Sequence, residues 1–99
     1  ARLPDGDGQV TMKSIWKFTL RNAENRFEMP QGATILCVQV QNDSVCLWAK
    51  CDVDAPKETR LIVIIGTGHP VDDHLDEYVY IGTVQTGPLV WHVFDAGVR

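Results

Sequence analysis

The stretch that decides the fold is Thr34 to Cys51, TILCVQVQNDSVCLWAKC. Two apolar runs flank Asn42-Asp43, a pair that tolerates the positive φ of a two-residue hairpin turn. The stretch therefore predicts a β-hairpin of strands 34–41 and 44–51, in which Gln41 faces Ser44 and the numbers of facing residues sum to 85. The facing pairs Val40 and Val45, Val38 and Leu47, and Leu36 and Ala49 then form one apolar face. We expect that face to lie on the core, because a slip of one residue would mix the two faces.

The opposite face of this hairpin is the leading candidate for a binding surface. It carries Ile35, Cys37, Gln39 and Gln41 beside Ser44, Cys46, Trp48 and Lys50. Interfaces favour this mixture of an aromatic anchor with hydrogen-bonding groups. The candidate contact residues are Trp48, Gln39, Gln41, Cys37 and Cys46, and the expected partner is a second copy of the chain, because most soluble oligomers are homo-oligomers. The alternative is that another layer of the same chain covers this face, and the sequence leaves both open.

Further strands surround the hairpin. Residues 13–20 alternate, with Trp16, Phe18 and Leu20 on one face, as in a half-buried strand. Short strands are also predicted at 26–29, 59–65, 78–85 and 89–94, and the unbroken LIVII of 61–65 is typical of a strand covered on both faces. Pro70 followed by two aspartates predicts a short helix at about 71–77. The expected fold is mainly β, an antiparallel barrel or sandwich-like roll of six to seven short strands, with the helix closing one end.

Length and charge limit the function classes. Ninety-nine residues suit one domain, and we expect a flexible leader or extension at 1–11 before a globular domain at 12–99. A net charge of −4 with scattered lysines and arginines gives no basic surface for nucleic acid. No run approaches the roughly 18 apolar residues of a membrane span. Three cysteines without a CxxC motif favour reduced thiols in a cytoplasmic protein.

The motif GTGHPVDDH at 66–74 holds two of the three histidines. His69, Asp72 and His74 are weak candidates for a metal site, and His69, Asp73 and His74 for catalysis. Both need the side chains to converge, and a metal would need ligands at about 2.0–2.2 Å. The structural interpretation is favoured: the glycines end a strand, and the aspartates meet the positive end of a helix dipole. We therefore expect no cofactor.

His92 lies in LVWHVF (89–94) and shares a face with Val90 and Phe94. A hydrogen-bonded structural histidine is the favoured interpretation. A nucleophilic dyad with Cys37 or Cys46 is the alternative, although no acyl-transfer motif surrounds either cysteine.

Several motifs together resemble a family of small uncharacterised proteins of bacteriophages and other bacterial mobile elements. These motifs are IWKF (15–18), MPQGA (29–33), ILCVQVQ (35–41), CLWA (46–49), DVDAPKE (52–58), GTGHP (66–70) and LVWHVF (89–94). The resemblance implies a phage or mobile-element setting inside a bacterial cell. It implies no activity.

The function expected from the sequence is a non-enzymatic binding or interaction protein that acts as a homo-oligomer. The alternative is a small metal-dependent or hydrolytic enzyme that uses the His69, Asp72, Asp73 and His74 loop. A carrier of a small molecule is a third possibility, and the sequence does not identify the ligand.

Overall fold

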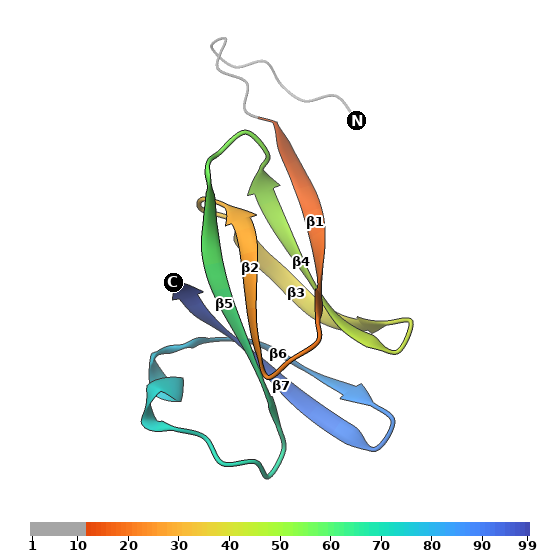
Figure 1. The fold of residues 1–99 in the computed structure, drawn as a ribbon. Helices are drawn as coiled ribbons and strands as arrows, with labels where there is room; N and C mark the ends of the chain where they lie inside the picture. The colour runs from red at the N-terminus through yellow and green to blue at the C-terminus, as the bar shows by residue number, and fades with distance from the viewer. Residues whose placement is uncertain (1–11) are drawn as a thin grey trace.

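The computed structural model describes residues 12–99, and the predicted leader at 1–11 lies outside the described residues. These residues form seven strands and one 3-10 helix (Figure 1). The strands are β1 (Lys13–Leu20), β2 (Glu24–Pro30), β3 (Thr34–Gln41), β4 (Ser44–Asp52), β5 (Lys57–Gly66), β6 (Val79–Thr86) and β7 (Leu89–Val98), and the 3-10 helix η1 spans Asp73–Glu77. The seven strands confirm the predicted mainly β class.

The strands form two antiparallel sheets that pack as a sandwich. The first sheet has the order β1-β4-β3, and the second has the order β2-β5-β7-β6. No hydrogen-bonded ladder joins the two sheets among residues 12–99, so the fold is sandwich-like and not a closed barrel. Edge strands β3 and β6 lie against each other on one side. On the other side, the edge strands β1 and β2 are linked by a short turn.

The hairpin of β3 and β4 has the predicted turn and, over most of its length, the predicted register. Asn42 and Asp43 have φ of 51° and 64°, as a type I′ turn requires. The pairing in which residue numbers sum to 85 is confirmed from Gln41–Ser44 to Cys37–Trp48. A β-bulge at Leu36 then shifts the register, so Ile35 and not Leu36 faces Ala49. Leu36 is 48% exposed, and the prediction that Leu36 faces the core is wrong.

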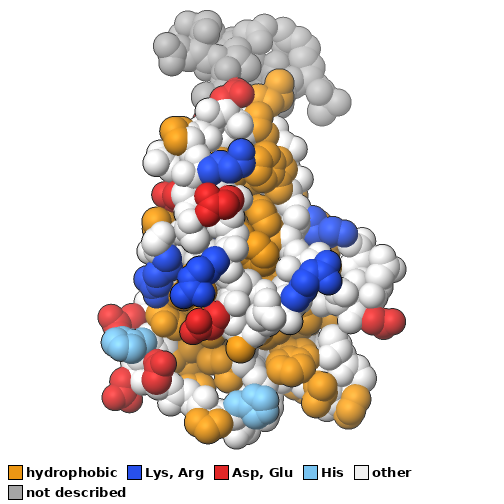
Figure 2. Space-filling model, in the orientation of Figure 1, with side chains coloured by type: hydrophobic (Ala, Val, Ile, Leu, Met, Phe, Trp, Pro, Cys, Tyr) orange, Lys and Arg blue, Asp and Glu red, His pale blue; other side chains and the backbone are white. Residues whose placement is uncertain are grey.

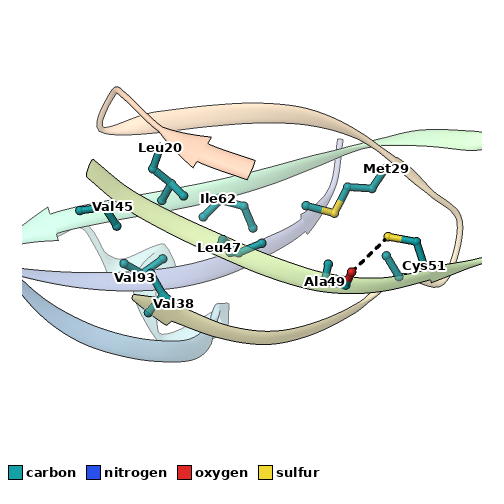
Figure 3. Packing of buried hydrophobic residues seen from close by; sticks show 10 residues of the cluster. Leu20, Met29, Val38, Val45, Leu47, Ala49, Cys51, Ile62 and Val93 are labelled. Atoms are coloured by element: carbon teal, nitrogen blue, oxygen red, sulfur yellow. Dashed lines mark hydrogen bonds between the residues drawn. The ribbon is translucent and has the colours of Figure 1, made fainter. Parts of the chain in front are cut away.

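The core lies between the sheets. Figure 3 shows Leu47 of β4 amid Val38, Ile62 and Val93, which β3, β5 and β7 contribute. The predicted inward face of β1 is confirmed, because Leu20 is buried and Trp16 and Phe18 pack against the cluster. Inward and outward positions alternate along each of these strands, as expected for two sheets packed face to face.

Aromatic rings line the side of the sandwich between β1 and β2. The rings of Phe18 and Phe27 pack in a tilted arrangement with their centroids 5.1 Å apart, and the Trp16 ring centroid lies 6.5 Å from that of Phe18. The Lys57 ammonium lies 5.9 Å from the centre of a Trp16 ring, within the range of a cation–π contact. Hydrophobic side chains are visible as a vertical strip in Figure 2. This packing joins the two sheets where no ladder hydrogen bonds do.

The predicted helix at 71–77 is a shorter 3-10 helix. Pro70 does not open it; Asp72 is the N-cap, in extended backbone, and its carboxylate accepts a hydrogen bond from the His74 N–H at 2.8 Å. Leu75 and Tyr78 line one hollow with Val63 and Ile65 of β5. These two β5 side chains point away from the core residue Ile62, since side chains alternate along a strand. The segment thus lies over the outer face of the second sheet and does not plug one end.

Gly82 of β6 is required by the close approach of β3. A Cβ atom at residue 82 would lie 2.9 Å from Cγ1 of Val38, and Val38 is itself buried. We expect Gly82→Ala to lower the free energy of unfolding by about 1–3 kcal/mol, because overpacking displaces side chains. Urea unfolding would measure this, and the double variant with Val38→Ala should lose less than the sum of the two single variants. Wild-type stability of Gly82→Ala would contradict this contact between the sheets.

Candidate functional site

The structure does not gather the side chains of GTGHPVDDH into one site. His74 Nδ1 lies 2.8 Å from Glu77 Oε2, and Asp72 caps η1. His69 lies instead against Gly66 and Trp91. Within residues 12–99, no group of three or more His, Cys, Asp or Glu is placed to hold a metal ion. A metal site built on His69, Asp72 and His74 is therefore not found among these residues.

The pair of His74 and Glu77 gives a pH-dependent prediction. The hydrogen bond to Glu77 raises the pKa of His74 above 6.5, and the charges of Glu77 and Asp72 add to this. Because the folded-state pKa is raised, the pairing favours folding below pH 6.5 and loses this effect as the pH rises through the folded-state value. NMR titration should show the pKa of His74 falling toward 6.5 in Glu77→Gln. In Asp76→Asn, a neighbouring control, it should stay near the wild-type value, and an unchanged pKa in Glu77→Gln would contradict the contact.

Two motifs that are distant in the sequence meet at the end of β5. Gly66 pairs with Trp91 in the ladder of β5 and β7. A Cβ atom at residue 66 would lie 3.0 Å from Cε1 of His69 and 3.2 Å from Cζ3 of Trp91. Only a glycine at residue 66 lets the imidazole and the indole approach the backbone at this position so closely. Gly66 thus lies against the side chains of both His69 and Trp91.

A half-open cavity of about 560 Å³ lies beside this pair. Leu20, Val45 and Ile64 contribute apolar lining, whereas Arg21, Asn22, Asp43, Thr86 and His69 contribute polar groups. The lining residues come from both sheets and from the turns that follow β1 and β3. The volume is within the roughly 300–1,000 Å³ of small-molecule sites.

Buried Asn25 fixes the turn that carries Arg21. Its Oδ1 accepts hydrogen bonds from the N–H groups of Arg21 at 2.9 Å and Asn22 at 3.2 Å, and its Nδ2 donates to the Asn22 carbonyl at 2.7 Å. A buried amide with these partners holds the backbone in one conformation. Neither Asn25 nor the cavity has a local motif, so the amino-acid sequence alone does not indicate them.

His92 is held by hydroxyl groups on both sides. Its Nε2 lies 2.7 Å from Thr67 Oγ1, and its Nδ1 lies 3.0 Å from Thr83 Oγ1. Thr83 is in turn 2.5 Å from the Tyr80 hydroxyl. Both ring nitrogens therefore have threonine partners, as a structural histidine requires. Neither Cys37 nor Cys46 takes part, so the arrangement gives no cysteine–histidine dyad.

The predicted contact residues of the central hairpin lie together on the outer face of the first sheet. Cys37, Gln39 and Gln41 of β3 face Trp48, Cys46 and Ser44 of β4, and Lys17 and Thr19 of β1 face Trp48 and Cys46 from the other side. Ile15 shares this face and is 60% exposed. We call this surface the tryptophan face; it comprises Lys13, Ile15, Lys17, Thr19, Cys37, Gln39, Gln41, Ser44, Cys46, Trp48 and Lys50. Ile35 belongs to the core side because of the bulge, which corrects its predicted position.

A side-chain hydrogen bond crosses part of the tryptophan face. Lys17 Nζ donates to Gln41 Oε1 at 3.0 Å, from β1 to β3 across β4. The registers place this bridge at the level of Cys46, whose neighbours are Thr19 and Gln39. Cys46 is only 2% exposed, while Trp48 beside it is half-buried.

All three cysteines are free thiols. Burial raises the pKa of the Cys51 thiol, and its S–H donates to the Ala49 carbonyl (Figure 3). Cys51 is therefore a structural core residue, and the expectation of reduced thiols in the cytoplasm stays a prediction.

A family model described as a domain of unknown function, DUF7352, matches residues 12–98. No curated protein and no solved structure matches the chain. Among residues 12–99, none of the helices is long and apolar enough to cross a membrane.

Proposed function

We propose that this chain, which belongs to the DUF7352 family of unknown function, is a non-enzymatic binding protein that associates with copies of itself through the tryptophan face. The observation that carries the proposal is the uncovered apolar surface of Trp48 and Ile15. Ile15 is 60% exposed, and Gln39, Gln41 and Lys50 around Trp48 are exposed as well. A half-buried tryptophan beside an exposed isoleucine and flanked by polar groups has the composition of an interface centre.

Charge supports a head-to-tail contact rather than a face-to-face one. The tryptophan face carries Lys13, Lys17 and Lys50, all exposed. A two-fold symmetric contact would bring this basic face against its own copy. The segment around η1 has the opposite charge: Asp72, Asp73, Asp76 and Glu77 are all exposed, and Figure 2 shows acidic side chains gathered at the lower left. We propose that this acidic segment of one copy meets the lysines of the next.

Charge reversal tests this arrangement. The variant Lys17→Glu/Lys50→Glu and the variant Asp73→Lys/Asp76→Lys should each lose association at low salt, because like charges then face each other. An equimolar mixture of the two should regain association, because both contacts between unlike variants then pair opposite charges. The control Arg26→Glu/Lys57→Glu changes the net charge equally without touching the tryptophan face, and it should associate as the wild type does. A mixture that stays dissociated, with both variants folded by circular dichroism, would refute the head-to-tail contact.

The cellular setting is part of the same proposal. The motifs between residues 15 and 94 support a phage or mobile-element origin, and three free thiols support a reducing compartment such as the bacterial cytoplasm. Expression of the protein with a periplasmic signal tests the second point. We expect a lower yield of folded protein there, because the thiols would be exposed to oxidation during folding.

A further inference from the structure

We infer that the cavity beside Trp91 is a binding site for a small aromatic carboxylate. The site is separate from the tryptophan face and does not depend on self-association. It is formed by residues that strands β1, β4, β5, β6 and β7 and their adjoining turns bring to one end of the sandwich.

The apolar part of the cavity is suited to a planar ring. The Trp91 Nε1–H donates to Thr86 Oγ1 at 2.8 Å, which satisfies the only polar group of the indole and fixes its orientation. The indole, with Leu20, Val45 and Ile64, supplies the apolar lining. Stacking of a ligand ring on a fixed aromatic wall strengthens binding by roughly two- to tenfold over burial alone.

Several polar side chains of the cavity have no side-chain hydrogen-bond partner among the described residues. Of the three histidines, His74 and His92 have side-chain partners, whereas no side-chain hydrogen bond is found for His69 within residues 12–99. The side chains of Arg21, Asn22 and Asp43 likewise have no hydrogen-bond partner among these residues. Asn25 bonds to the backbone of Arg21, Asn22 and Ile62, and not to their side chains. The arginines of β2 and β5 contrast with this, because Arg26 pairs with Glu24 and Arg60 with Asp95.

The chemistry of these groups favours a single negative charge on the ligand. The Arg21 guanidinium is always charged, and its geometry matches a carboxylate. Asn22 and His69 add donors on the same cavity. Asp43 would repel a second negative charge, so a monocarboxylate fits better than a phosphate or a dicarboxylate.

The close contact at Gly66 makes the site preformed. His69 and Trp91 both lie within 3.2 Å of the position of a Cβ atom at residue 66. An added methyl group must displace one of the two rings. Gly66→Ala should therefore weaken ligand binding, while the fold away from this end of the sandwich stays as in the wild type. A preformed wall also reduces the entropy lost when a ligand binds.

NMR titration of the full chain with three small probes tests the inference. 3-Phenylpropionate carries both ring and carboxylate, 3-phenylpropanamide lacks the charge, and hexanoate lacks the ring. We expect 3-phenylpropionate to produce saturable shifts at Trp91 and Thr86 with a dissociation constant on the order of 1 mM, and each of the other two probes to bind roughly tenfold more weakly. Arg21→Gln should remove the preference for the carboxylate over the amide, and Arg26→Gln, the matched control outside the cavity, should keep it.

The outcomes separate this inference from the proposed self-association. Trp48→Ala should bind 3-phenylpropionate as the wild type does. Shifts at Trp91 and Thr86 that do not saturate by about 10 mM, or an Arg21→Gln variant that still prefers the carboxylate, would overturn the inference and leave the proposed self-association untouched.

Discussion

Replacing Arg60 by alanine is expected to lower the free energy of unfolding by about 3 kcal/mol, because it leaves a carboxylate unpaired inside the sandwich. Arg60 Nη2 lies 2.7 Å from Asp95 Oδ2, and the two side chains are only 14% and 11% exposed. Arg60 also donates to the Ala33 carbonyl at 3.1 Å, which ties β5 to the start of β3. Urea unfolding would measure the loss as a lower midpoint at unchanged slope.

Arg26 on the neighbouring strand is the matched control. Its contact with Glu24 is 3.7 Å long and exposed, and such pairs contribute little. Arg26→Ala should therefore change the free energy of unfolding by less than about 0.5 kcal/mol. The double variant Arg60→Met/Asp95→Leu should be more stable than Arg60→Ala, since it removes both charges. If the double variant were the less stable of the two, the loss would come from packing and not from the unpaired charge.

Leu47→Ala should cost about 2–5 kcal/mol, the usual range for a leucine deleted from a closed core. Leu47 is fully buried, at 0% exposure, and faces Val38 across the hairpin. The same substitution at Leu36, which the bulge places outside the core, should cost less than about 1 kcal/mol. Thermal or urea unfolding of the two variants compares them directly. Equal losses would mean that Leu36 faces the core and that the bulge is absent.

The hairpin illustrates how far the sequence determines this fold. Alternation specifies the register wherever polar and apolar residues alternate, as they do from Val38 to Gln41. It fails at residues 35–38, where Ile, Leu, Cys and Val are all apolar, because an inserted residue then leaves no mark on the pattern. The two-residue turn was predictable because Asn42-Asp43 is a local signal.

The prediction of a helix at 71–77 was wrong for a different reason. Pro70 and the two aspartates are genuine helix-start signals, but only five residues, Asp73–Glu77, form η1. Asp72 caps this short turn from extended backbone. A helix this short gains little from its own hydrogen bonds, so contacts of Leu75 and Tyr78 with the sheet decide its form.

The candidate site could be predicted only in part. The part of the tryptophan face on β3 and β4 follows from alternation within one hairpin and lies as expected except for Ile35, whereas the contribution of β1 depends on its pairing with β4. The approach of His69 and Trp91 to Gly66 depends on the pairing of β5 with β7, which skips β6 in the chain order. Proximity in the sequence indicated His74, and not Trp91, as the neighbour of His69. The pair of Arg60 and Asp95 was missed as well, although Arg60 has the same strand parity as the core residue Ile62.

The measurement that tests the central claim most directly is the molar mass of the full chain by size-exclusion chromatography with light scattering. The protein should have a mass that is a multiple of the 11.1 kDa monomer and that rises with concentration over roughly 1–100 μM. Trp48→Ala should shift the mass toward the monomer, whereas Leu89→Ala, an exposed residue beside the last turn, should not. A mass of 11.1 kDa at every concentration, identical for wild type and Trp48→Ala, would contradict self-association through the tryptophan face.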